Sequence, residues 1–278
     1  MQFLKDLWSA RELLVNLVMR EVRGQYKRTV MGRLWSLLNP IASMLVYTLI
    51  FSLVLRIKPA VGDPSGLDVF ALWLLCGLLP WTFFANSLNI GMQSLVVNAP
   101  LVTKVYFPRA VLPISTVGTM ASNWIVEMGV LIAALTIAGS VAILWMPAAL
   151  LFMLLMALFT VGITIALAVA NAWFRDIQHL VSLLLQFWMY FTPIIYPVSM
   201  VQNLSEKVGG LLGTSIQIID IYTLNPLYSF VTAFRQLLYD NRWPDASVTL
   251  GCLVWTVISL LIGIIVFSRN EKKIAEIV

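Results

Sequence analysis

The chain of 278 residues is 60% hydrophobic and only 11% charged, and its net charge at pH 7 is +5. Soluble globular domains contain roughly 25% charged residues, so this composition excludes that class and indicates an all-α polytopic membrane protein. The basic residues flank apolar segments instead of forming one patch, so the charge does not indicate a nucleic-acid partner.

The first segment, residues 9–31, is basic and amphipathic. At about 100° per residue, one side of a helix over this segment gathers Glu12, Asn16, Arg20, Arg23 and Lys27. The opposite side gathers Leu14, Leu17, Val18 and Val22. The pattern predicts an interface helix in the plane of the membrane surface, with its apolar side down and its cations toward lipid phosphates or a partner.

Long uncharged intervals predict six transmembrane helices, because roughly 20 apolar residues in a helix cross the hydrocarbon. The predicted spans cover about residues 34–55, 69–90, 110–137, 147–170, 180–198 and 246–268. Gly139, Ser140 and Pro147 cluster within residues 138–147, so we expect the turn between the third and fourth spans there.

The distribution of Lys and Arg predicts the orientation. Six spans place both termini on one side of the membrane, and of the 18 Lys and Arg residues thirteen then fall on that side and five on the other. Positive residues are retained in the cytoplasm, so the sequence predicts that both termini are cytoplasmic, an N-in/C-in topology.

The region 199–245, on the external side, does not fit a simple loop. It contains a Gly209-Gly210 break and then the uncharged stretch 221–234, which is too short to cross the membrane and too apolar to be a solvated loop. We expect a re-entrant or interfacial helix that begins at Asn225-Pro226 and caps the external face.

Two internal loops have the character of contact points. Residues 98–109 predict a short amphipathic helix with exposed aromatic side chains, which suits a protein partner; packing on lipid headgroups is the alternative. The loop over residues 171–179 is similar but shorter, and Asp176 could cap the helix that follows it.

Isolated polar and sulfur-containing residues offer few catalytic groups. Glu127 is the one acid well inside a predicted span, which suggests either proton coupling or a hydrogen-bonded structural role with Ser122, Asn123 or Thr119. The two cysteines lie in apolar runs and are expected to be small core residues. The chain has one histidine, so no metal site is expected.

Several motifs resemble those of a known family. Residues 14–40 read LVNLVMREVRGQYKRTVMGRLWSLLNP, and KVYFPR, FRDI and YFTPIIYP follow at residues 104–109, 174–177 and 190–197. Together with Asn225-Pro226, these stretches resemble the membrane subunits of ABC-2-type polysaccharide exporters, which include the O-antigen, capsule, teichoic-acid and galactan exporters. The resemblance covers essentially the whole chain, in order.

The resemblance implies that the chain is a permease and not an enzyme, and that it spans the bacterial cytoplasmic membrane several times. It implies a homodimer with two copies of an ABC ATPase subunit, which binds the ATP and Mg, so that this chain has no cofactor of its own. Its substrate would be a lipid-linked polysaccharide. The sequence contains no Gly-Lys dipeptide, so it lacks the GxxxxGK[ST] loop that cradles phosphates.

The same resemblance implies roles for particular residues. Contact with the ATPase is expected of Asn98, Pro100, Lys104, Tyr106, Phe107, Pro108, Arg109, Phe174, Arg175 and Asp176. A translocation path of aromatic faces is expected of Tyr47, Phe51, Trp81, Phe84, Phe187, Tyr190, Phe191 and Tyr196, although aromatic residues also favour membrane interfaces. The head of the lipid carrier would be guided by Arg20, Arg23 and Lys27.

Two other functions compete with this one. An ABC-2 permease for drugs or lipids would share the topology, but the aromatic-rich outer segment argues against it. A membrane-embedded transferase acting on lipid-linked sugars would need clustered acids or histidines at one face. The outer acids of this chain are instead scattered along the sequence.

Overall fold

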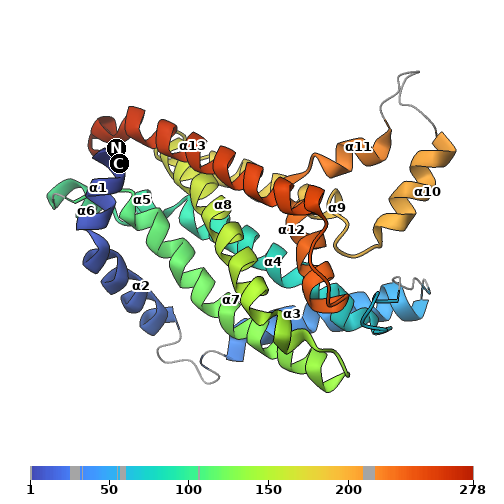
Figure 1. Ribbon diagram of the computed structural model, residues 1–278. Coiled ribbons are helices and arrows are strands. Elements are labelled where there is room, and N and C mark those ends of the chain that lie inside the picture. The colour runs from blue at the N-terminus through green and yellow to red at the C-terminus, as the bar shows by residue number, and fades with distance from the viewer. Residues whose placement is uncertain are drawn as a thin grey trace.

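The computed structural model describes residues 2–25, 32, 34–54, 56, 61–105, 107–208 and 217–277, and within these residues it contains helices and no strand (Figure 1). Four helices are long and apolar enough to cross a membrane. They are α4 (Phe70–Gly91), α7 (Val111–Ile137), α8 (Met146–Trp173) and α13 (Ala246–Ile277). Both chain termini lie at one end of the molecule, here called the terminus-bearing end.

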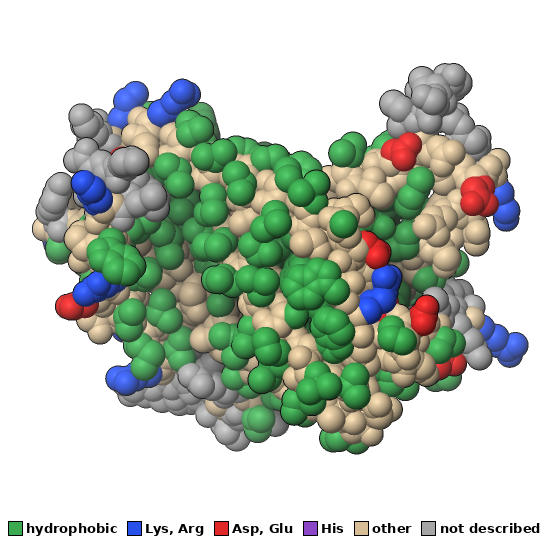
Figure 2. Space-filling model, viewed as in Figure 1, with side chains coloured by type: hydrophobic (Ala, Val, Ile, Leu, Met, Phe, Trp, Pro, Cys, Tyr) green, Lys and Arg blue, Asp and Glu red, His purple; other side chains and the backbone are tan. Residues whose placement is uncertain are grey.

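The distribution of side chains on the surface also fits a membrane-spanning protein. Figure 2 shows hydrophobic side chains over the middle of the visible face and charged side chains toward its two ends. A membrane-spanning protein has this distribution, because lipid tails are the solvent for its middle.

Helix α4 lies at the centre of the larger apolar core. Leu74 and Phe84 of α4 are fully buried, and aromatic rings extend the contact to the neighbouring helices. Phe83 stacks on Trp124 of α7 with ring centroids 4.3 Å apart, and Phe84 stacks on Phe159 of α8 at 5.6 Å. Such stacked pairs add stabilisation beyond the area that they bury.

Helices α8 and α13 approach until their backbones touch. A Cβ atom added to Gly162 would lie 2.3 Å from the backbone carbon of Ser259, and one added to Gly263 would lie 2.4 Å from the Gly162 carbonyl oxygen. Ser259 and Gly263 are four residues apart, so they share one face of α13. Small residues at this spacing let membrane helices pack closely.

The turn between α7 and α8 falls within residues 138–147, where the sequence predicts it. Gly139 has a φ of +96°, a conformation that L side chains rarely adopt, and the short helix η2 (Ala142–Trp145) leads into α8. The Ser140 hydroxyl donates to Asn241 Oδ1 at 2.9 Å, which joins this turn to the segment before α13.

Two predicted spans are not among the four described helices that are long and apolar enough to cross a membrane. The first corresponds to α3 (Leu34–Tyr47) followed by the π-helix η1 (Thr48–Val54). For the fifth, the predicted helix through residue 198 is wrong, because α9 (Ile177–Tyr190) ends at residue 190 and turns follow it. Pro193 and Pro197 lack the N–H groups that would continue the helix. At 1.5 Å per residue the 14 residues of α9 are shorter than the hydrocarbon.

Within the predicted amphipathic segment 9–31 the structure has α2 (Arg11–Gln25), which follows a separate helix α1 (Gln2–Ser9). Residues 26–31, with Lys27, lie outside the described part. Arg20 and Arg23 are exposed as predicted. The apolar side, however, packs on protein: Leu17 and Val22 are buried, and a Cβ on Gly118 of α7 would lie 3.1 Å from Val18. The sequence pattern cannot distinguish a lipid surface from a helix surface.

The crossing of α8 and α13 generates a prediction about stability. Gly162→Ala should lower the free energy of unfolding by about 1–3 kcal/mol, because the methyl group forces two backbones apart. Gly129→Ala is the matched control, since a Cβ at this position of α7 meets nothing within 4 Å. Thermal unfolding of the purified variants in detergent measures both, and an equal change in the two would contradict this packing.

Candidate functional site

At the terminus-bearing end, two short helices follow α4: α5 (Ser94–Val97) and α6 (Ala99–Lys104). The helix predicted over 98–109 therefore covers only six residues. Asn98 joins the two helices, because its side-chain amide donates to the Ser94 carbonyl at 2.8 Å and its own carbonyl accepts from the amides of Leu101 and Val102.

A second apolar cluster fixes α6 against the body of the protein. Val102 is buried with Leu17 of α2 and Phe267 of α13, and Phe107 packs against this cluster. Arg109 Nη1 donates to the Glu271 carbonyl near the end of α13. Phe107 and Arg109 thus have partners inside the chain, which the sequence did not indicate.

The residues around α6 that remain accessible form its outer side. Pro100 and Lys104 are exposed, Asn98 and Pro108 are partly buried, and Tyr106 lies outside the described residues. The next turn, between α8 and α9, exposes Phe174, Arg175 and Asp176, with Phe174 65% exposed.

Asp176 occupies the N-cap position of α9, but its side chain makes no capping hydrogen bond, so the predicted capping role is wrong. The backbone explains this, because Asp176 has helical dihedral angles (φ −75°, ψ −16°) instead of the extended ones that aim a capping side chain. Lys273 lies over the Trp173 ring at 5.9 Å, which brings this turn beside the end of α13. Both predicted contact loops therefore lie at the terminus-bearing end.

At the opposite end, Asn225 joins the break after α9 to α12 (Pro226–Phe234). Its Oδ1 accepts from the Trp188 indole at 2.9 Å and from the Leu227 amide at 3.1 Å, and its Nδ2 donates to Thr192 Oγ1 at 2.9 Å. The helix begins at Pro226, where the Asn-Pro pair predicts it.

Arg235 is one of the five Lys and Arg residues that the predicted topology places on the external side, and it is buried behind this break. It begins the π-helix η4 (Arg235–Tyr239), and its guanidinium donates to the carbonyls of Pro193 and Ile194, the former at 2.6 Å. It also lies 3.6 Å from the centre of the Trp73 ring. A Cβ on Gly77 would lie 3.0 Å from Nη2, which is tighter than an ordinary contact, so a larger residue here would require the guanidinium to shift. In the sequence, only Gly77 within the second predicted span indicates that another group approaches α4 closely at this point.

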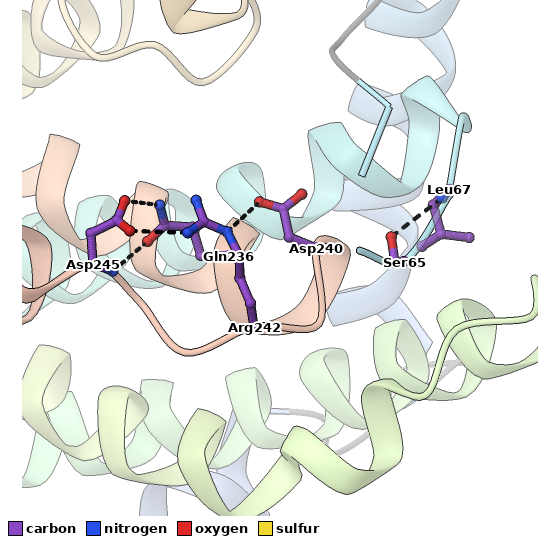
Figure 3. Close-up of polar contacts among 6 residues, drawn as sticks. All are labelled: Ser65, Leu67, Gln236, Asp240, Arg242 and Asp245. Carbon is purple, nitrogen blue, oxygen red and sulfur yellow. Dashed lines mark hydrogen bonds and ion pairs between the residues drawn. The ribbon is translucent and has the colours of Figure 1, made fainter. Parts of the chain in front are cut away.

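The connector between η4 and α13 carries a polar cluster (Figure 3). Asp245 accepts from Arg242 Nη1 at 2.9 Å and from the Gln236 amide, and its backbone N–H donates to Gln236 Oε1 at 3.0 Å. Asp240 lies 3.8 Å from Arg242 Nε, and its carbonyl accepts from the Ser65 amide at 3.1 Å. The cluster ties the loop before α4 to the start of α13.

Two acids of this cluster titrate differently because their surroundings differ. Burial raises the pKa of Asp240 to about 6, although Arg242 opposes the rise. The hydrogen bond from Gln236 lowers the pKa of Asp245, and Arg242 lowers it further.

Beyond α9, two more helices extend from the opposite end: α10 (Val198–Val208) and α11 (Ile218–Thr223) (Figure 1). The N-terminus of α11 is closed by a capping box between Gln217 and Asp220. The Tyr196 and Tyr222 hydroxyls are 3.1 Å apart, and Tyr196 also donates to the Tyr190 carbonyl at 2.7 Å. Residues 209–216 of the predicted gate region lie outside the described part.

The predicted aromatic path divides into two groups. Phe187, Tyr190 and Phe191 are more than half exposed, and Tyr47, Phe51 and Tyr196 are partly exposed. Trp81 and Phe84 do not fit the assignment: they are 5% and 0% exposed, because they fill the core between α4 and its neighbours.

Two of the hydroxyls near the acid inside α7 have other acceptors. Glu127 is half-buried, and the hydroxyls nearest it in sequence are used elsewhere: Ser122 donates to the Thr119 carbonyl, and Thr119 donates to the Ser115 carbonyl. Thr119 is also 3.3 Å from a carboxylate oxygen of Glu21 on α2. The acid that meets the polar face of α7 is thus Glu21.

Comparison with known proteins gives consistent matches over nearly the whole chain. The ABC-2 type transporter family matches residues 12–239. The O-antigen export system permease protein RfbA of Myxococcus xanthus is 31% identical over 275 residues, 99% of this chain and 98% of that protein. RfbA of Klebsiella pneumoniae is 28% identical, covering 96% and 95% of the two chains. The polysialic acid transport protein KpsM of Escherichia coli is 23% identical, covering 92% of each.

The polar cluster generates a prediction about pH. The raised pKa of Asp240 means that the protonated form favours folding, and this contribution is lost as the pH rises through about 6. Asp240→Asn should therefore raise the free energy of unfolding by about 1 kcal/mol near pH 8 and leave it unchanged near pH 4, since solvent screens a partly exposed group.

Asp245→Asn is the control with the opposite sign. The pKa of Asp245 is lowered, so its carboxylate stabilises the fold above its ordinary pKa, and removing the charge should reduce stability near neutral pH. Thermal unfolding of both variants across this pH range is the measurement, and a pH-independent effect of Asp240→Asn would contradict the assignment.

Proposed function

The chain belongs to the ABC-2 type transporter family, and from this premise we propose that it is the permease subunit that moves a lipid-linked polysaccharide across the cytoplasmic membrane. The observation that carries the substrate class is the set of full-length relatives, which are named for O-antigen export and polysialic acid transport. Two copies of a separate ATPase subunit supply the energy, and two copies of this chain enclose the path.

The proposed topology has six crossings. Helices α4, α7, α8 and α13 make four, α3 with η1 makes the fifth, and α9 with the turns that follow it makes the sixth. The excess of Lys and Arg on the side of the termini supports a cytoplasmic position for the terminus-bearing end. The helices α10, α11 and α12 then form the external gate region over residues 199–245. The large apolar exposure of α3 and η1, with Leu45 at 60% and Leu53 at 70%, supports contact with lipid or with a second copy.

ATPase contact is proposed for the exposed parts of the two internal loops. Pro100 and Lys104 of α6, with Phe174, Arg175 and Asp176 of the second turn, are accessible at the same end. Asn98, Phe107 and Arg109 act behind this surface, because their contacts inside the chain fix the position of α6. Motion of the ATPase subunits is transmitted through these fixed elements.

The translocation path is proposed along the exposed aromatic residues of α9 and the facing edge of α3. Phe187, Tyr190 and Phe191 present flat faces that contact sugar C–H edges and still let a chain slide. Tyr47 of α3 and Phe51 of η1, with ring centroids 6.3 Å apart in an edge-to-face pair, continue this surface. Arg20 and Arg23 guide the phosphates of the lipid carrier at the cytoplasmic side.

The first experiment is a copurification. The tagged chain, coexpressed with its candidate ATPase, should bring down that subunit, and Lys104→Glu combined with Phe174→Ala should reduce the recovered ATPase by about tenfold, equivalent to about 1.4 kcal/mol. Lys207→Glu, an exposed charge reversal on α10 at the opposite end, is the control. Undiminished pairing in the double variant would remove these loops from the contact, and failure to pair at all would overturn the permease assignment.

A second experiment addresses the path. Phe187→Ser with Tyr190→Ser should lower glycan export several-fold while ATPase pairing is retained, because only stacking surfaces are lost. Trp243→Ser, which removes a 51% exposed aromatic residue away from α9, should leave export unchanged. Surface glycan detected on intact cells gives the readout. Equal export by the unaltered chain, the double variant and Trp243→Ser would exclude α9 from the path.

A further inference from the structure

The last part of α13, residues 267–277, lies at the terminus-bearing end and touches both loops proposed for ATPase contact. Arg109, at the end of the first loop, donates a hydrogen bond to the Glu271 carbonyl. Trp173, at the start of the second loop, has the Lys273 ammonium over its ring at 5.9 Å. Glu271 and Lys273 fall within one turn of the helix. One short stretch of α13 therefore contacts two loops that are far apart in sequence.

Apolar packing supports these two contacts. Phe267 and Ile274 of α13 are 1% and 0% exposed, and their spacing of seven residues places them on one face of the helix. They belong to the apolar cluster that contains Val102 of α6 and Val169 of α8. Helix α8 ends at Trp173, so the cluster joins α13 to the first loop directly and to the second loop through α8.

The first loop is not close-packed on all sides. A cavity of about 140 Å³ lies between α2, the α4–α5 turn and α7, and its lining includes Glu21, Val97 and Asn98. Atoms that border a cavity lack the dispersion contacts that hold close-packed helices in place. The position of this loop therefore depends strongly on its contacts with α13 and with the apolar cluster.

Helix α13 also connects this stretch with the opposite end of the molecule (Figure 1). It is continuous from Ala246 to Ile277, and its 32 residues make a helix about 48 Å long. Its first turn follows the polar cluster around Asp245, and its middle is held against α8 where Gly162 meets Ser259. A displacement of its end is therefore carried along a stiff element.

We propose that the end of α13 holds the two loops at a fixed separation, so that they move as one body with the ATPase subunits. The inference rests on the proposed function, which assigns ATPase contact to both loops. Arg109, Lys273 and Ile274 are positioning residues in this arrangement, because they act through the exposed residues Lys104 and Phe174. Loops that could move apart would absorb the motion of the ATPase and transmit less of it to the spans.

The experiment measures the separation of the two loops in the complete complex with its ATPase. Val105→Cys and His179→Cys put spin labels at exposed positions of the first and second loops. The native Cys76 and Cys252 are both 0% exposed and take no label. Coexpression with excess unlabelled chain leaves one labelled copy in each complex, so pulsed electron paramagnetic resonance reports a distance within one chain. That distance should have the same narrow distribution with and without ATP.

Two substitutions disconnect the loops from α13. Ile274→Ala combined with Arg109→Ala should broaden the distribution of the distance between the labels. Leu261→Ala, at a 54% exposed position of the same helix, is the control and should leave the distribution narrow. A loop separation that changes with ATP in the chain without these substitutions would overturn the proposal. An unchanged narrow distribution in the double variant would overturn it as well, because another element would then fix the loops.

Transport distinguishes a positioning role from a purely structural one. At equal recovery of ATPase, the double variant should lower glycan export about fivefold, because the coupling is weakened while the contact surface remains. Ile274→Val with Arg109→Lys keeps an apolar side chain and a donor, so it should recover most of the export. Export that falls only in proportion to the recovered ATPase would leave both residues a structural role and overturn the proposal. No pairing in the unaltered chain would fail the proposed function, whereas pairing with loops that separate would fail this inference alone.

Discussion

Hydrocarbon offers no water to backbone N–H and C=O groups, and this constraint decides where the chain can leave the helix. The turns over residues 191–197 interrupt the apolar segment that begins with α9 and leave carbonyls without helical partners. Asn225 and Arg235, both from the α12–η4 segment, supply donors to this break. The buried guanidinium in turn gains two acceptors and the face of Trp73. The break and the charge therefore stabilise each other, because the carbonyls of Pro193 and Ile194 gain charged donors and the guanidinium gains acceptors.

The two ends of the bundle are built differently. At the terminus-bearing end, α2, α6 and the end of α13 share one apolar cluster, and Arg109 donates a hydrogen bond to the Glu271 carbonyl beside it. At the opposite end, hydrogen bonds that involve the side chains of Asn225, Arg235 and Gln236 hold the turns together. Apolar clusters tolerate small rearrangements better than hydrogen-bonded networks, which lose specific partners when they shift. Among the described residues, apolar packing thus holds one end of the bundle and directional hydrogen bonds hold the other.

Asn98 and Glu21 show how the amphipathic helix and the short helices after α4 become one unit. Glu21 lies on α2 and Asn98 lies at the start of α6, yet both line the same cavity. Glu21 also meets Thr119 of α7, so three elements converge at this point.

The sequence by itself determined the membrane class, the approximate bounds of α4, α7, α8 and α13, the turn at Gly139 and the start of α12, because hydropathy, Gly and the Asn-Pro pair act locally. The same local patterns could not say what covers an apolar side: Trp81 reads as a possible path residue and is core, and the apolar side of α2 meets α7 instead of lipid. Tertiary structure alone decided that Arg235 is buried and that Glu21 faces a cavity. Both depend on partners far away in sequence, and no periodicity encodes contacts between elements that only folding brings together.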